Sequence, residues 1–155
     1  MSRVLKQTPA AFAPQFGFNL QASAYAYAPT ALATGGALLL TVWRLRAGGG
    51  QFVSDGGLML LALACYLTAA VFHLTDLYAP SNLFRRVGLW MTTAGVFFNL
   101  GSWGVRWVAA YDRELQVIAR QGGEMPWAFR YIPFTNLYDM SLAFAFGAGL
   151  TTLLI

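Results

Sequence analysis

Long apolar stretches alternate with short polar ones along most of this chain. Four of the apolar stretches reach the length of about 20 residues that a helix needs to cross a bilayer. They are residues 24–43, 57–77, 87–108 and 136–155. Because backbone amides in lipid must bond within their own segment, each stretch predicts a helix. The pattern therefore predicts an all-α integral membrane protein with about four transmembrane helices in a small bundle.

Polar and glycine-rich segments separate the predicted spans. Ser54 and Asp55 follow a run of glycines and predict the start of the second helix, and Ser81 or Asn82 predicts the start of the third. The third connection, residues 109–135, is long and carries charges of both signs. Its segment YDRELQVIARQ is typical of a short amphipathic helix. We therefore expect a long interfacial loop before the last span.

The N-terminal segment predicts neither a span nor a signal peptide. Residues 1–22 contain basic residues but no continuous apolar core, so we expect an N-terminal arm followed by one transmembrane helical domain over residues 23–155. Basic residues in short segments favour a cytoplasmic N-terminus and an external long loop. Arg44 and Arg46 oppose this orientation. The apolar end of the sequence indicates either a last helix that just reaches the far interface or the front part of a longer protein.

Composition agrees with a membrane protein and excludes other classes. The 155 residues are 57% hydrophobic and 10% charged, whereas soluble domains carry about 25% charged residues. The net charge of +4 is modest, and no basic cluster alternates with aromatic residues, so nucleic acid is not an expected partner. The expected partners are the lipid bilayer and other membrane protein subunits.

Few side chains suit catalysis or metal binding. Cys65 is the sole cysteine and His73 the sole histidine, which excludes an intrachain disulfide and a metal site made of several histidines and cysteines. The sequence has no nucleophile–base arrangement and no phosphate-binding loop. We therefore expect a protein that is not catalytic by itself.

Two polar side chains inside the predicted spans are candidate cofactor contacts. His73 lies one turn before Asp76 in the second span, and ionisable groups inside a membrane are candidates for function. His73 either contacts a haem or quinone or is an interfacial histidine near the helix end. Asn99 lies in the middle of the third span. It either bonds a neighbouring helix or contacts a ligand.

Opposite charges lie at one membrane boundary of the predicted bundle. Arg106 and Trp107 close the third span, as is typical of an interfacial anchor. Asp139 lies in the first turn of the fourth span, where a negative charge is favourable for the helix dipole. An ion pair between Arg106 and Asp139 would neutralise two charges that are costly near lipid.

Small residues recur at intervals that bring them to one face of a helix. This spacing predicts close packing between helices in lipid, or alternatively a surface for another subunit. The residues concerned are Ser141, Ala145 and Gly149, then Ala143, Gly147 and Thr151, and in the third span Gly95, Gly101 and Gly104.

The last hundred residues carry four segments in a characteristic order: ALACYLTAAVFHL, FRRVG, GVFFNLGSWGVRW and IPFTNLYDMSLAFAFGAG. In this order, residues 57–155 resemble the N-terminal part of the CcsA/ResC family, also called CcsB, of system II cytochrome c biogenesis. In that family an Arg-Trp pair ends one helix, and a Pro-x-x-Asn-hydrophobic-Tyr-Glu element opens the next. The matching positions are Arg106, Trp107, Pro133, Asn136, Leu137 and Tyr138, with Asp139 in place of the glutamate.

The resemblance implies a role in haem delivery or attachment at a bacterial inner membrane, with haem shared with a partner chain. Two positions depart from the family: Tyr131-Ile132 replaces a frequent Gly-His, and Asn99 lies near a frequent histidine. The tryptophan-rich WWD haem-binding segment and its flanking histidines are absent from this sequence. Three interpretations follow: half of a split haem lyase, a truncated reading frame, or an accessory structural subunit of a larger respiratory or photosynthetic complex.

Overall fold

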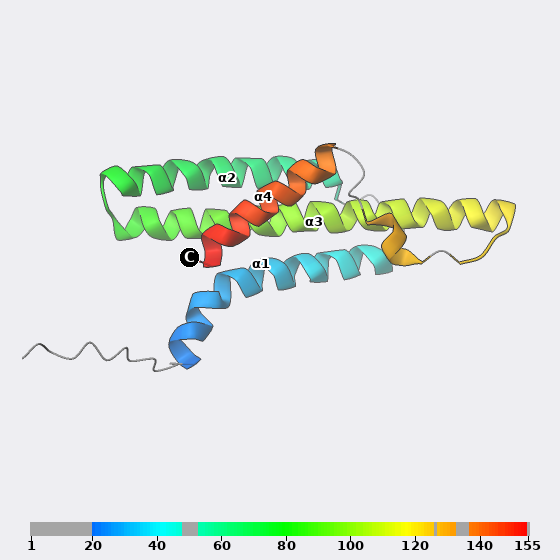
Figure 1. Cartoon of the computed structure of the whole chain (residues 1–155), viewed down its shortest axis with the longest axis horizontal. Coiled ribbons are helices and arrows are strands. Elements are labelled where there is room, and N and C mark those ends of the chain that lie inside the picture. The colour runs from blue at the N-terminus through cyan, green and yellow to red at the C-terminus, as the bar shows by residue number, and fades with distance from the viewer. Residues whose placement is uncertain (1–19, 48–52, 126, 133–136, 155) are drawn as a thin grey trace, which may run out of the picture.

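The computed structural model describes residues 20–47, 53–125, 127–132 and 137–154. Figure 1 shows α3 running through the middle of the molecule, α1 and α2 lying along it and α4 crossing it diagonally. In the described residues the chain forms these elements: α1 (Leu20–Ala47), α2 (Asp55–Tyr78), α3 (Asn82–Gln121), the 3-10 turn η1 (Ala128–Tyr131) and α4 (Leu137–Leu154).

Three of these helices are long and apolar enough to cross a membrane: α1 over Ala26–Ala47, α2 and α4. The predicted all-helical architecture is thus confirmed for the described residues, with three helices that suit membrane spans. The third predicted span lies in α3, which is less apolar. Its polar residues Thr92, Thr93, Asn99 and Ser102 are buried, since α1, α2 and α4 all pack on this helix. Polar side chains are costly when they face lipid, so in membrane proteins they usually face the interior of the helix bundle.

The third helix is longer than predicted and replaces the separate interfacial helix that we expected. It runs unbroken over 40 residues instead of ending at residue 108. Neither glycine nor proline interrupts residues 105–121, and the alanine, glutamate, leucine and arginine residues there are strong helix formers. Gly122, with φ 73°, follows the last turn. A helix of this length measures about 60 Å, roughly twice the hydrocarbon thickness, so its final turns extend beyond the bundle (Figure 1).

The first helix also begins earlier than predicted, and it bends. It starts at Leu20 rather than residue 24, so residues 20–22 are helical and do not belong to the N-terminal arm. The rest of that arm lies outside the described residues. Pro29 lies inside the helix, and Figure 1 shows the bend in this first part. Proline removes one backbone hydrogen bond and clashes with the preceding turn, which accounts for the bend.

Side chains cap the second and third helices as the sequence predicts. The Ser54 hydroxyl accepts a hydrogen bond from the Gly57 amide at 3.1 Å, and the Ser81 hydroxyl accepts one from Leu83 at 3.3 Å. Ser81, not Asn82, is therefore the cap of α3. Asp76 accepts a hydrogen bond from the Ser81 amide at 2.8 Å, which closes the turn between α2 and α3.

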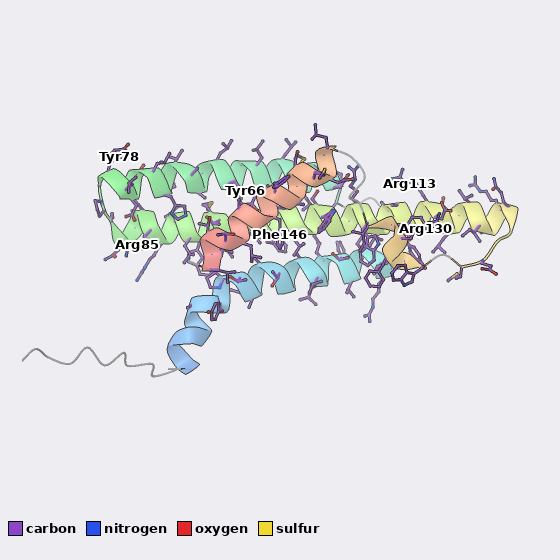
Figure 2. The ribbon with its side chains drawn as sticks, viewed as in Figure 1. Tyr66, Tyr78, Arg85, Arg113, Arg130 and Phe146 are labelled. Atoms are coloured by element: carbon purple, nitrogen blue, oxygen red, sulfur yellow. The ribbon has the colours of Figure 1, made fainter. Side chains whose placement is uncertain are left out.

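Glycines allow the helices to approach closely at the centre of the bundle. A Cβ atom added to Gly149 would lie 2.8 Å from the hydroxyl of Tyr66 and from Val96, and one added to Gly95 would lie 2.7 Å from the Tyr66 ring. Tyr66 of α2 therefore fills the space that two glycines leave on α3 and α4. Figure 2 labels Tyr66 close to the place where α4 crosses the other helices. Gly147, on the other small-residue face of α4, has no such neighbour within 4 Å.

Replacing Gly149 with alanine should destabilise the protein by about 1–3 kcal/mol, since an added methyl group overpacks the Tyr66 contact. The matched substitution Gly147→Ala should be neutral or slightly stabilising, because alanine is the better helix former. Thermal unfolding in detergent, followed by circular dichroism, measures both. Equal effects of the two substitutions would contradict this account of the α4 contact.

Candidate functional site: the Arg106 junction

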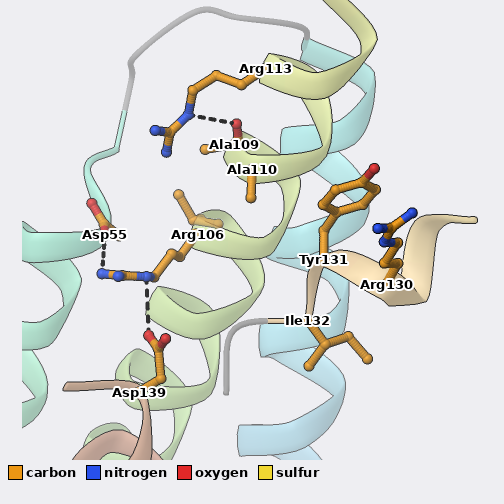
Figure 3. A pocket seen from close by; sticks show the side chains of 10 residues that line it. Asp55, Arg106, Ala109, Ala110, Arg113, Arg130, Tyr131, Ile132 and Asp139 are labelled. Atoms are coloured by element: carbon orange, nitrogen blue, oxygen red, sulfur yellow. Dashed lines mark hydrogen bonds and ion pairs between the residues drawn. The ribbon is translucent and has the colours of Figure 1, made fainter. Parts of the chain in front are cut away.

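Arg106 of α3 joins the starts of two other helices at one end of the bundle. Its Nε atom lies 3.1 Å from Oδ1 of Asp139 at the start of α4, and its Nη1 atom lies 3.6 Å from Oδ2 of Asp55 at the start of α2 (Figure 3). Its guanidinium also lies over the ring of Tyr138, 4.6 Å from the centroid. The predicted Arg106–Asp139 ion pair is therefore present, and Asp55 is a third member that the sequence did not reveal.

The two carboxylates at this junction differ in burial. The side chain of Asp139 is 1% exposed and that of Asp55 is 40% exposed. A buried charge is costly unless it is paired, whereas a solvated one is not. The contact of Asp139 with the guanidinium is an ion pair and not a well-aligned hydrogen bond. Asp139 therefore depends on Arg106 far more than Asp55 does.

The same face of α3 makes further polar contacts deeper in the bundle. The Ser102 hydroxyl donates to the backbone carbonyl of Asp55 at 2.8 Å. The Asn99 amide nitrogen donates to the carbonyl of Leu142 at 3.2 Å and lies 3.5 Å from the Tyr66 hydroxyl. Asn99 thus makes an interhelical bond, one of the two alternatives that the sequence left open, and its amide nitrogen is already engaged by the protein. Asn99, Ser102 and Arg106 follow the spacing of three and four residues that defines one helix face.

Trp107, next to Arg106, holds the connection that leads to α4. Its indole Nε1 donates to the carbonyl of Ala128 at 2.9 Å, and its ring stacks on Phe129 with centroids 5.7 Å apart. The sequence suggested an ordinary membrane anchor, but the structure gives Trp107 partners in η1. The other two predicted motif residues, Pro133 and Asn136, lie outside the described residues.

His73 lies between α2 and α3, with its ring against the backbone of α3. Its Nε2 atom is 3.3 Å from the hydroxyl of Thr92, and that hydroxyl donates to the carbonyl of Gly88 at 2.9 Å. While this hydroxyl donates to Gly88, its oxygen can only accept from His73, which assigns the tautomer with the proton on Nε2. A Cβ atom added to Gly88 would lie 2.9 Å from Nδ1 and 2.8 Å from Cε1 of His73. In this arrangement His73 is a contact between two helices.

A groove of about 420 Å³ lies beside His73, between α2 and α4. A haem there would need an axial ligand, but the imidazole edge that carries both nitrogens faces α3. His73 therefore does not present an axial ligand to this groove in this arrangement. Among the residues described, no cluster of three or more His, Cys, Asp or Glu side chains could hold a metal ion. The groove is lined by Leu63, Tyr66, Ala69, Ala70, His73, Thr92, Ala145, Ala148, Gly149 and Thr152.

Comparisons with known proteins add no relative to this picture. No protein-family model, no curated protein and no solved structure matches the chain. The resemblance to the CcsA/ResC family therefore stays a prediction from the sequence segments quoted above.

Substituting Asp139 with asparagine should destabilise the protein by about 3 kcal/mol, because it leaves the charge of Arg106 without its closest partner. Asp55→Asn is the matched control and should cost less than about 1 kcal/mol, since that carboxylate is partly solvated. A double-mutant cycle of Asp139→Asn with Arg106→Gln should show a coupling above about 1 kcal/mol in unfolding free energy. Additive effects in that cycle would refute the ion pair as a stabilising contact.

Removing the Trp107 side chain should release η1 from α3. We expect Trp107→Ala to raise the rate of tryptic cleavage after Arg130 about tenfold, through loss of the stacking and the hydrogen bond to Ala128. Trp107→Phe keeps an aromatic ring and should give an intermediate rate. Cleavage after Arg120 serves as the internal reference, and the exposed Trp90 provides a control substitution. Unchanged cleavage after Arg130 in Trp107→Ala would show that other contacts hold η1.

Proposed function

We propose that this chain is a membrane component of cytochrome c biogenesis, a partial CcsA-like protein that works with a second membrane chain. The observation that carries the proposal is the convergence of Arg106, Tyr138 and Asp139 at one end of the bundle, with distances of 3.1 Å to the carboxylate and 4.6 Å to the ring. These residues belong to two separate segments of the motif by which the chain resembles that family. Because the two motif segments contact each other in the structure, they support a shared role better than sequence matches at two separate places would.

In this proposal the chain is a scaffold and not the catalyst. His73 and Asn99 both bond to neighbouring helices, so the partner chain would hold most of the haem through a WWD segment and external histidines. The bundle offers a broad apolar surface to such a partner or to lipid. Exposed residues on α2 and α4 include Leu60, Leu67, Leu74 and Phe144.

We further infer that α3 crosses the bilayer as a fourth span. It runs antiparallel to α2, with Gly88 beside His73 and Gly95 beside Tyr66. A helix that accompanies a spanning helix along its length crosses the same hydrocarbon layer. This arrangement would place the Arg106 junction at one interface and the turn at Ser81 at the other. In the proposed setting the membrane is the bacterial inner membrane, and the N-terminus is cytoplasmic.

Purification of the tagged chain from its native membrane in mild detergent tests this function. Mass spectrometry should identify a co-purified membrane chain with a WWD segment, and a pyridine haemochrome assay should detect haem in the same fraction. Haem recovered without such a partner would overturn the split-protein form of the proposal. Stable recovery with the subunits of a respiratory or photosynthetic complex would instead support the accessory-subunit alternative.

A complementation assay adds a functional readout. In a bacterial strain that lacks its own cytochrome c assembly proteins, the chain expressed with the identified partner should restore haem-stained cytochrome c. Neither chain alone should do so. Full restoration by the partner alone would show that this chain is dispensable for haem attachment.

A further inference from the structure

Two cavities of different chemistry lie on either side of Ile132, at the Arg106 end of the bundle. The polar cavity has a volume of about 430 Å³ and includes three arginines and two aspartates in its lining (Figure 3). The apolar cavity, of about 200 Å³, lies between α1 and α3. Its one hydroxyl, on Thr41, donates to the carbonyl of Ala37 at 2.9 Å within α1. It is lined by Ala37, Leu38, Thr41, Leu100, Trp103, Gly104, Trp107 and Ile132.

The cavities are displaced from one another along α3. The apolar cavity uses α3 residues between Leu100 and Trp107, and the polar cavity uses residues between Val105 and Arg113. At a rise of 1.5 Å per residue their centres differ by about 8 Å along the helix. The α3 residues that line the polar cavity are the ones nearer Gln121, and this end of α3 protrudes from the bundle (Figure 1). An apolar space followed outward by a cationic one reproduces the order of acyl chain and phosphate at a membrane interface.

The polar cavity has positive charge that its own carboxylates do not neutralise. Asp55 and Asp139 both lie within 3.6 Å of Arg106. Among the residues that the structure describes, Arg113 and Arg130 form no ion pair. Arg113 donates through Nε to the carbonyl of Ala109 at 3.2 Å, which leaves its terminal amino groups for another acceptor.

The two arginines come from different walls of the cavity, Arg113 from α3 and Arg130 from η1. Figure 3 shows the side chain of Tyr131 on the same wall as Arg130. Guanidinium groups bind phosphate through paired N–H donors better than other side chains do. Tryptophans at this end, among them the exposed Trp43 and Trp127, are typical of headgroup level. The two arginines favour a phosphate as the ligand. The apolar cavity next to them and the nearby tryptophans favour a phosphate that belongs to a lipid.

We propose that the two cavities together bind one anionic phospholipid. Its phosphate lies between Arg113 and Arg130, and part of one of its acyl chains occupies the apolar cavity between α1 and α3. Such a lipid contacts α1, α3 and η1 at once, so its binding stabilises the position of η1. This inference is independent of the proposed role in cytochrome c biogenesis.

Native mass spectrometry of the purified full chain tests the site. After incubation with phosphatidylglycerol or with phosphatidylcholine of the same acyl chains, one phosphatidylglycerol should be retained, and the melting temperature should rise with that lipid. The double substitution Arg113→Gln, Arg130→Gln should weaken its retention about tenfold through lost interaction with the anionic headgroup. The pair Arg85→Gln, Arg120→Gln removes the same charge elsewhere and should leave retention unchanged.

A second pair of variants tests the apolar cavity. Leu38→Trp should fill it and reduce lipid retention, whereas Leu39→Trp changes the neighbouring exposed position and should not. Equal retention of both lipids, or an equal effect of both arginine pairs, overturns the headgroup assignment. Complete displacement of the lipid by inorganic phosphate indicates a site for free phosphate and overturns the proposal that a lipid binds there. Equal behaviour of the two tryptophan variants overturns the acyl-chain assignment.

Discussion

The pairing of Arg106 with Asp139 is the contact on which the arrangement of α4 depends. Asp139 is the only charged residue in α4, and it is almost fully buried. A charge in that position is stable only beside an opposite one, so the start of α4 has to lie where Arg106 can reach it. Asp55 brings the start of α2 to the same guanidinium. The starts of two helices, α2 and α4, are therefore placed by one side chain of α3.

The polar face of α3 specifies the register between the helices, and the glycines of the bundle specify the distance between them. Hydrogen bonds from Asn99 and Ser102 set the register of α3 against α4 and α2, because a shift of either neighbour would leave a polar group unpaired in an apolar surrounding. Gly95 and Gly149 set the distance, because Tyr66 occupies the room that they leave. Between residues 87 and 108 the low hydropathy of α3 therefore has a structural reason, since the polar side chains of Thr92, Thr93, Asn99 and Ser102 are buried against other helices.

The sequence predicts those features that depend on whether a segment prefers lipid or water, or on the chemistry of neighbouring residues in the chain. Apolar length predicted the helices, hydroxyl residues predicted the caps, and opposite charges at one boundary predicted the Arg106–Asp139 pair. The continuation of α3 was missed because a fall in hydropathy marks the end of an apolar segment, and a helix can continue beyond that point. Asp55 was taken for a capping residue, and its second role depends on the packing of α2 against α3. His73 and Trp107 have partners in other segments, which no local pattern specifies.

Because Arg106 and Trp107 are adjacent in α3, together they position the segment that connects α3 to α4. Adjacent residues on a helix point about 100° apart, so Arg106 faces α2 and α4 while Trp107 faces η1. One rigid turn of α3 thereby fixes both the middle of the connection and its end. The resemblance places an aspartate where the CcsA/ResC family has glutamate. Aspartate is shorter by one methylene group, so it reaches Arg106 only if α4 begins close to α3, as the ring of Tyr138 beneath the guanidinium requires as well. A rearrangement of α4 therefore has to break the ion pair and the ring contact together.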